Sequence, residues 1–256
     1  MPALGRLMPQ LTKVDLTDCE PSLFDESFAG ALAKGTLLTE LDLYSCGIGS
    51  QECEFLAPAL SQLVYLEKLN LGANHIGDKG ALHLGVAMPS LAKLRQLSVF
   101  NYPSDTIRIG VEGVTALVAG LSDNAGLQKF DLSHHAIGDT GAEILAASMP
   151  GWRRLKKLDI IGNNIGDQGA SAVAGCLHQC VRLRELSIGN RIGDSGAIAI
   201  AKAIPHMPKS TIFRYNCIDL TDNSIGRKGA SALEDAADYT HLHLNGNPCK
   251  ERYIVK

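Results

Sequence analysis

The chain has 256 residues, of which 45% are hydrophobic and only 5% are aromatic, and its 24 basic and 27 acidic side chains leave a net charge of −3. This length suffices to bury a sizeable core, which must consist mainly of Leu, Ile, Val and Ala. The small net charge, without long runs of one sign, argues against a nucleic-acid-binding or anionic-membrane surface. No apolar run reaches the ~18 residues of a membrane span and no secretion leader is present, so we expect no membrane insertion.

One pattern recurs along the whole chain. Residues 155–170 read LKKLDIIGNNIGDQGA, residues 66–81 read LEKLNLGANHIGDKGA, and residues 127–142 read LQKFDLSHHAIGDTGA. Self-similarity at a fixed period is the sequence signature of a repeat protein. Nine repeats begin at Leu11, Leu38, Leu66, Leu94, Leu127, Leu155, Leu183, Tyr215 and Tyr239.

Each repeat predicts a strand followed by a helix. Alternation of apolar and polar residues indicates strands with these inward pairs: Val14/Leu16, Leu41/Leu43, Leu69/Leu71, Leu97/Val99, Phe130/Leu132, Leu158/Ile160, Leu186/Ile188, Ile218/Leu220 and Leu242/Leu244. Helical spacing follows, as in Ala170, Val173, Ala174 and Leu177. Every connection is long enough for the strands to run parallel. We expect Asp78, Asp139, Asp167 and Asp194 to cap the helices that they precede, and Pro89, Pro150 and Pro205 to end them.

The motif L-x-x-L-x-L-x-x-N/C-x-I resembles the leucine-rich repeat, and the long unit with a helical second half resembles the ribonuclease-inhibitor-like class. The resemblance covers nearly the whole chain. It implies an α/β solenoid of about nine repeats, a single domain over residues 1–256, with residues 248–256 as a C-terminal tail or cap. Strands lie about 4.8 Å apart and packed helices about 8–10 Å apart. We therefore expect a horseshoe arc with a concave parallel sheet and convex helices.

The ninth position of the repeats predicts a buried ladder that hydrogen-bonds the turns. Its members are Cys19, Cys46, Asn74, Tyr102, His135, Asn163, Asn223 and Asn247. Seven cysteines, an odd number without compact spacing, indicate reduced thiols and hence a cytoplasmic protein. We interpret Cys176 and Cys180 as surface or half-buried residues, and Trp152 as local packing.

Three breaks in the pattern and the two ends stand out. Residues 101–109 and 204–214 carry extra residues, and one residue is missing between Leu186 and Ile192. Insertions in solenoids form loops, either at a functional rim or as neutral surface variation. The N-terminal residues 1–9 lack a polar capping unit, so the chain is either part of a longer protein or self-associates through this end. Tyr253, Ile254 and Val255 are expected to cover the last strand.

The outward strand positions predict a binding surface on the concave sheet face. Charged residues for steering lie beside apolar or aromatic anchors. The candidate partner-binding residues are Tyr44, Lys68, Asn70, Arg95, Phe100, Lys129, Asp131, Lys157, Asp159 and Ile161. Alternatively, neighbouring Lys and Asp side chains only neutralise each other, at ~0–1 kcal/mol per pair.

A second cluster combines Cys217, Asp219, His241 and His243 on the last two strands. If the register holds, these four form a metal site or a Cys–His dyad, although parallel strands approximate a zinc tetrahedron only with strain. The sequence holds no phosphate-binding glycine loop and no H-E-x-x-H. We therefore expect no metal, no cofactor and no enzymatic activity.

The resemblance implies a scaffold or recognition domain that binds a protein partner through the concave sheet and its adjacent loops, and does not name that partner. A regulator similar to the Ran GTPase-activating protein is an alternative, although this sequence lacks the acidic tail of that protein. A further alternative is an enzyme centred on Cys217 and His241.

Overall fold

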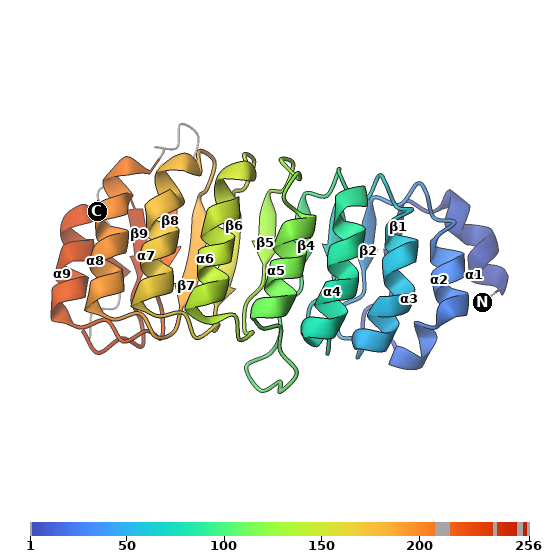
Figure 1. The fold of residues 1–256 in the computed structure, drawn as a ribbon, viewed down its shortest axis with the longest axis horizontal. Coiled ribbons are helices and arrows are strands. Elements are labelled where there is room, and N and C mark those ends of the chain that lie inside the picture. Colours follow the sequence, from blue (N-terminus) through green and yellow to red (C-terminus); the bar gives the residue numbers. More distant parts are fainter. Residues whose placement is uncertain (1, 208–215, 238–239, 250–252, 255–256) are drawn as a thin grey trace. The chain divides into compact units, whose positions relative to one another are not determined.

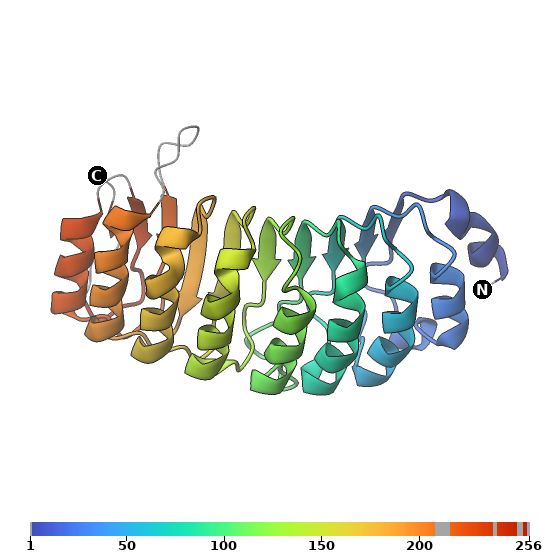
Figure 2. The same cartoon turned by 45° about the horizontal axis from the view of Figure 1, so that its top comes forward.

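The computed structural model describes residues 2–207, 216–237, 240–249 and 253–254. The chain forms two compact units, unit 1 (Met1–Phe130) and unit 2 (Asp131–Lys256), each of which is described by itself. In both units the helices lie in one layer and the strands in another (Figures 1 and 2). The horseshoe curvature and the single domain that we expected for the whole chain stay predictions.

The strands of unit 1 pair in parallel and in chain order, as predicted. Lys13 pairs with Glu40, Glu40 with Lys68, and Lys68 with Gln96. The predicted inward residues Leu41, Leu69 and Leu97 are at most 2% exposed, because alternation points them at the helix layer. The strands are β1 (Lys13–Asp15), β2 (Glu40–Asp42), β3 (Lys68–Asn70) and β4 (Gln96–Ser98).

The helices of unit 1 cover one face of these strands (Figure 1). Pro89 does not extend its helix; it lies in the short 3-10 turn Met88–Ser90 that directly follows α4. The N-terminal residues form a short helix, which is followed by the 3-10 turn Met8–Gln10. The helices are α1 (Pro2–Leu7), α2 (Glu26–Leu32), α3 (Ser50–Leu60), α4 (Gly77–Ala87) and α5 (Val111–Gly120).

Unit 2 repeats the same arrangement. Its parallel strands are β6 (Lys157–Ile161), β7 (Glu185–Gly189), β8 (Asn216–Asp219) and β9 (Thr240–His243). Its helices are α6 (Gly138–Ser148), α7 (Asp167–Cys176), α8 (Asp194–Ala203) and α9 (Arg227–Ala236). The short strand β10 (Tyr253–Ile254) pairs antiparallel with β9, Tyr253 opposite His243. Val255 lies outside the described residues. Strand β5 (Lys129–Asp131) contains the boundary between the units.

The core is aliphatic, as the composition requires. Leu158, Ile160 and Val173 are fully buried. Trp152 is 1% exposed, which confirms its interpretation as a packing residue. Cys176 and Cys180 are 7% and 5% exposed, so their assignment to the surface was wrong. Both side chains point into the helix layer, where Cys176 Sγ lies 3.8 Å from Met149 Sδ.

The asparagine ladder is present. Asn74 Nδ2 donates to the carbonyl oxygens of Leu43 (2.8 Å) and Leu71 (2.9 Å), and Asn74 Oδ1 accepts from Cys46 N (3.0 Å). Asn163, Asn223 and Asn247 bond in the same way between neighbouring repeats. Buried backbone groups of the turns are thereby satisfied at each step.

Cys46 is buried as expected, and Cys19 is half-buried. The assignment of Tyr102 to the ladder was wrong. Tyr102 is 44% exposed, and Asn101, one residue earlier, is the buried residue at 1%. Asn101 Nδ2 donates to Ile107 O (2.8 Å) and so braces the insertion instead of the next repeat.

Asp78, Asp139, Asp167 and Asp194 do not cap their own helices, which corrects the sequence prediction. One carboxylate oxygen of each accepts two backbone N–H groups at the start of the helix in the following repeat, at 2.7–2.9 Å. Asp78 binds Gly110 and Gly113, Asp139 binds Gly166 and Gly169, Asp167 binds Gly193 and Gly196, and Asp194 binds Gly226 and Gly229. Each aspartate therefore joins two repeats.

The insertion at 101–109 forms a loop between β4 and α5 that folds on itself. Arg108 Nε donates to Asp105 O (2.9 Å), Arg108 Nη2 donates to Pro103 O (2.6 Å), and Tyr102 N donates to Asp105 Oδ2 (3.0 Å). The loop projects at the lower edge of the green part of Figure 1. Of the second insertion, residues 204–206 form a 3-10 turn and residues 208–214 lie outside the described residues. Among the described helices, none has the length and apolarity to cross a bilayer.

Candidate binding surface on the free sheet face

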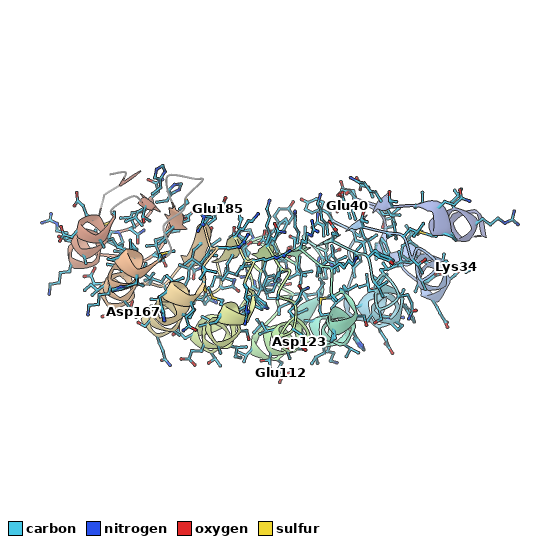
Figure 3. All side chains as sticks on the ribbon, turned by 90° about the horizontal axis from the view of Figure 1, so that it is seen from above. Lys34, Glu40, Glu112, Asp123, Asp167 and Glu185 are labelled. Carbon is cyan, nitrogen blue, oxygen red and sulfur yellow. The ribbon has the colours of Figure 1, made fainter. Side chains whose placement is uncertain are left out.

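The free sheet face is the side of the strands that the helices do not cover. Figure 3 shows Glu40 of unit 1 and Glu185 of unit 2 on this side, whereas Glu112 and Asp167 lie on the helix side. The short strands hold their outward side chains in rows, because successive residues alternate between the two faces. Most of the sequence-predicted binding residues lie in these rows.

Glu40 and Lys68 of the free face in unit 1 belong to ion pairs. Glu40 Oε1 lies 3.0 Å from Lys13 Nζ and 2.9 Å from Lys68 Nζ. Hydrogen bonds from Lys68 and Lys13 lower the pKa of the Glu40 carboxyl. Asn70 Nδ2 donates to Asp42 Oδ1 at 3.0 Å. The ion pairs of Glu40 are exposed to solvent and therefore weak, so Lys68 keeps most of its capacity to bind elsewhere.

Three aromatic side chains gather where the strands of unit 1 end. The ring centroids of Tyr44 and Phe100 lie 6.0 Å apart, and those of Phe100 and Tyr102 lie 6.1 Å apart at 88°. The hydroxyl groups of Tyr44 and Tyr102 are hydrogen-bonded to each other, which raises the pKa of Tyr44. We call these three residues the aromatic cluster.

Gly72 makes room for this cluster. It occupies the repeat position between those of Tyr44 and Phe100, and a Cβ there would lie 2.3 Å from Phe100 Cε1. The sequence predicted Tyr44 and Phe100 as separate anchors, and the structure brings them together. The sequence-based prediction missed Tyr102, which belongs to the insertion and not to a strand. The Asn-Tyr-Pro run at the start of the insertion was the available signal.

Arg95 lies one residue before β4, at the edge of the face. Its Nη2 is 3.3 Å from Glu67 Oε1, a side chain at the equivalent position of the previous repeat. Lys129, at the start of β5, is exposed. Both side chains are therefore accessible to a partner. Arg95 is accessible at the edge of the sheet where the strands begin.

In unit 2 the face is more acidic. Lys157 Nζ lies 3.6 Å from Glu185 Oε2 and 3.9 Å from Asp159 Oδ2. Burial, and then the charge of Asp131, raise the pKa of Asp159 to about 6, and Asp219 adds to the effect. Ile161 is half-buried opposite Gly189. The carboxylates of this row repel one another, since too few cations lie between them.

The predicted register of the last two strands is confirmed: Cys217 pairs with His241 and Asp219 with His243. Cys217 Sγ approaches His243 Nε2 at 3.8 Å, on the diagonal. Burial and the charges of Asp219 and Glu185 raise the pKa of the Cys217 thiol, which disfavours a nucleophilic thiolate. In the described part of the chain, no group of three or more His, Cys, Asp or Glu side chains is placed to hold a metal ion.

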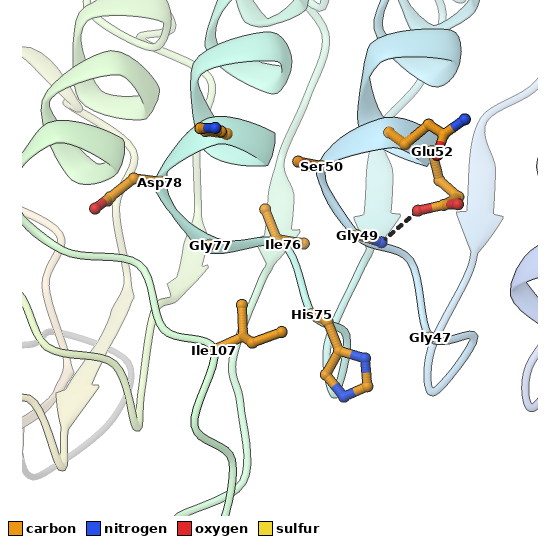
Figure 4. A pocket seen from close by; sticks show the side chains of 11 residues that line it. Gly47, Gly49, Ser50, Glu52, His75, Ile76, Gly77, Asp78 and Ile107 are labelled. Carbon is orange, nitrogen blue, oxygen red and sulfur yellow. Dashed lines mark hydrogen bonds between the residues drawn. The ribbon is translucent and has the colours of Figure 1, made fainter.

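A shallow pocket of about 520 Å³ lies in unit 1 among the loops that lead from strands into helices. Figure 4 shows Glu52 in this pocket accepting a hydrogen bond from Gly49 N, at 2.8 Å. Asp78 accepts from the N–H groups of α5. Because both carboxylates already cap helices, we assign no ligand to this pocket.

Comparison with known proteins agrees with the repeat architecture. The family model "Leucine Rich repeat" matches residues 62–85, 123–146, 154–174, 183–201 and 216–233. The mouse protein "NACHT, LRR and PYD domains-containing protein 12" is 35% identical over 106 residues, which is 41% of this chain and 10% of that protein. Mouse and human "Protein NLRC5" are 33% and 30% identical over 40% and 46% of this chain.

The matched stretches span only 5% and 6% of the two NLRC5 proteins, so this chain corresponds to a small part of its curated relatives. Among solved structures, an internalin from Listeria monocytogenes aligns over 95% of this chain and 83% of its own, with 17% identity and a TM-score of 0.42. The repeated parallel strand–helix units and the five matched repeats make this chain a leucine-rich repeat protein.

Proposed function

We propose that the chain is a non-enzymatic recognition module that binds a protein partner through the free face of unit 1, centred on the aromatic cluster. The observation that carries the proposal is the grouping of Tyr44, Phe100 and Tyr102 on an accessible sheet face. Tyrosine and other aromatic residues dominate the energetic centres of protein interfaces, because they bury a large area while losing little rotamer freedom.

The cluster is held in place before any partner binds. Gly72 leaves room for the Phe100 ring beyond the end of β3, and the turn within the insertion fixes Tyr102 through Asp105. A surface that is ordered in advance loses less conformational entropy on association. Asp42 and Asn70 lie beside it, since Asp42 accepts from Tyr44 N and Asn70 accepts from Gly72 N, and an apolar centre with polar neighbours is usual for an interface.

The test compares the proteins that wild type and a Tyr44→Ala/Phe100→Ala variant retain from a cell extract, by quantitative mass spectrometry. Truncating two anchors should reduce recovery of the specific partner at least ~10-fold. Tyr65→Ala is the matched control, since Tyr65 is an exposed tyrosine of unit 1 that contacts Lys93 before β4 and lies outside the cluster. Equal recovery of every protein by the three forms would contradict the proposal.

We also propose that the chain belongs to the ribonuclease-inhibitor-like class and works in a reducing compartment such as the cytoplasm. Repeats of about 28 residues with full α-helices support the class, and seven free thiols, five of them buried, support the compartment.

The GTPase-activating alternative stays a prediction. Faster GTP hydrolysis by any member of a small-GTPase panel would favour it over a pure scaffold.

A further inference from the structure

Two consecutive loops of unit 2 carry a concentration of positive charge. They lead from the 3-10 turns Met149–Gly151 and Leu177–Gln179 into β6 and β7, at the upper edge of Figure 1. Residues 152–156 and 180–184 contain no Asp or Glu. Their cations, which we call the basic rim, are Arg153, Arg154, Lys156, Arg182 and Arg184. The first four are exposed and Arg184 is half-buried.

The basic rim places like charges next to each other. Arg184 N donates to Lys156 O at 2.8 Å, so these two residues are direct neighbours across the starts of β7 and β6. Arg154 and Arg182 occupy the position two residues earlier in the same two repeats. Neighbouring strands lie about 4.8 Å apart, and like charges opposite each other destabilise a sheet. The fold therefore tolerates a local repulsion here.

The corresponding edge of unit 1 shows the opposite arrangement. In two consecutive repeats of unit 1, Glu67 and Arg95 occupy the repeat position that Lys156 and Arg184 occupy in unit 2. Glu67 and Arg95 form an ion pair at 3.3 Å. In unit 2, none of the five cations has a carboxylate partner among the residues that the structure describes. The ion pairs within the described part of that unit belong to Lys157, on the free face. The sequence continues the trend, since residues 204–215 hold Lys209 and Arg214 but no acid.

The backbone that carries the rim is well fixed. Leu155 N donates to Trp152 O at 2.9 Å, and Leu183 N donates to Cys180 O at 3.0 Å. Trp152, Leu155 and Leu183 are at most 1% exposed. The cations thus project from two anchored turns, and a ligand meets charges that are already in position.

We propose that the basic rim binds an acidic, Asp- and Glu-rich segment of a protein partner. Charge complementarity requires an anion. The adjacent free face carries Asp159, Glu185 and Asp219, which would repel a phosphate polymer that runs past the rim. Trp152, the aromatic residue of these loops, is buried and offers no platform for a nucleic-acid base. A peptide, in contrast, can place its acids on the rim and other residues on the face. This proposal rests on unit 2 and is independent of the aromatic cluster.

The test measures binding of a fluorescent oligoglutamate peptide to the whole chain by anisotropy at low salt. Arg154→Glu/Arg182→Glu should raise the Kd at least about 10-fold, because exposed side chains that attract the peptide then repel it. Arg154→Lys/Arg182→Lys should bind within a few-fold of wild type. Arg227→Glu/Lys228→Glu is the matched control, with the same charge change at two exposed positions of α9 in the same unit.

Three results would overturn the proposal. The first is that wild type fails to bind oligoglutamate at low salt. The second is that the rim and control variants weaken binding equally, which would show an effect of net charge alone. The third is that a single-stranded oligonucleotide, or a vesicle containing phosphatidylserine, binds the rim more tightly than oligoglutamate does. Binding that is lost only in the rim variant, and that falls as salt rises, supports it.

Discussion

Asp167 caps α8, the helix of the following repeat: its Oδ1 accepts the N–H of Gly193, the residue directly before that helix, at 2.7 Å. The same oxygen accepts the N–H of Gly196 at 2.8 Å. The first turn of α8 is therefore completed by the repeat before it, and the two helices cannot separate without leaving N–H groups unpaired. The repeat that precedes α4 has Ser50 at the position of this aspartate, and so offers no carboxylate to α4. Helix α4 begins at Gly77, one position earlier in its repeat than α8 does, and Gly77 takes the left-handed conformation with φ of 58°.

Removing this carboxylate should weaken the contact between the two repeats. We expect Asp167→Ala to lower the free energy of unfolding by ~1–3 kcal/mol, since a cap is lost and two N–H groups are left without an acceptor. Urea unfolding measures the total effect. Amide hydrogen exchange at Gly193 and Gly196 should become faster than exchange in the centre of α8.

Asp123→Ala is the control, because Asp123 is exposed and its side chain is not part of a cap. That substitution should change the free energy of unfolding by less than ~0.5 kcal/mol. An equally small effect of Asp167→Ala would contradict the cross-repeat cap.

Two glycines of α7 should respond in opposite directions to the same substitution. A Cβ at Gly169 would lie 2.7 Å from Asp139 Oδ1 and 2.9 Å from Ala142 Cβ. We expect Gly169→Ala to destabilise the protein by ~1–3 kcal/mol, because it displaces the capping carboxylate. Gly175 has no atom within 4 Å of its Cβ position, so Gly175→Ala should stabilise α7 by ~0.5–1 kcal/mol. Urea unfolding of both variants checks the pair, and two changes of the same sign would refute the explanation.

Asp159 should make stability depend on pH. Its pKa is about 6 in the folded protein against 3.8 for an unperturbed aspartate. Between these values the folded state keeps a proton that the unfolded state has released, so the contribution of Asp159 to stability falls as pH rises from about 4 to 6. Asp159→Asn should therefore be neutral near pH 4 and stabilising above pH 6, by up to ~3 kcal/mol. Urea unfolding as a function of pH, with Asp123→Asn as control, gives the difference. A constant difference across this range would be inconsistent with the raised pKa.

Cys217 should behave as an ordinary protonated thiol. Burial and two neighbouring carboxylates raise its pKa, so we expect alkylation by iodoacetamide at pH 7 to be slower than that of free cysteine. The rate should increase about tenfold per pH unit without a plateau in this range. Peptide mapping by mass spectrometry assigns the site, and Cys217→Ser is the blank. Reaction faster than that of free cysteine would indicate an activated thiolate and would restore the Cys–His dyad.

The sequence by itself determined the repeats, the strands, the helices and the core. Leu41, Leu69 and Leu97 recur at a fixed spacing, and a strand and a helix each impose their own period on buried residues. It also determined the ladder role of Asn74 and Asn163, since an asparagine at one fixed place in each repeat meets the same turn. These properties depend on residues that are close in sequence.

Only the tertiary structure decided what lies between repeats. Asp78 reaches Gly110, 32 residues away, whereas Asp167 reaches Gly193, 26 residues away. Because of the insertion and the deletion, the same contact joins residues at different sequence separations, so a search for one fixed spacing does not find it. Tyr102 joins the aromatic cluster for the same reason, because the insertion places its side chain against Phe100 and Tyr44. Contacts between neighbouring repeats depend on register, side-chain direction and loop path, and these are settled only when the chain has packed.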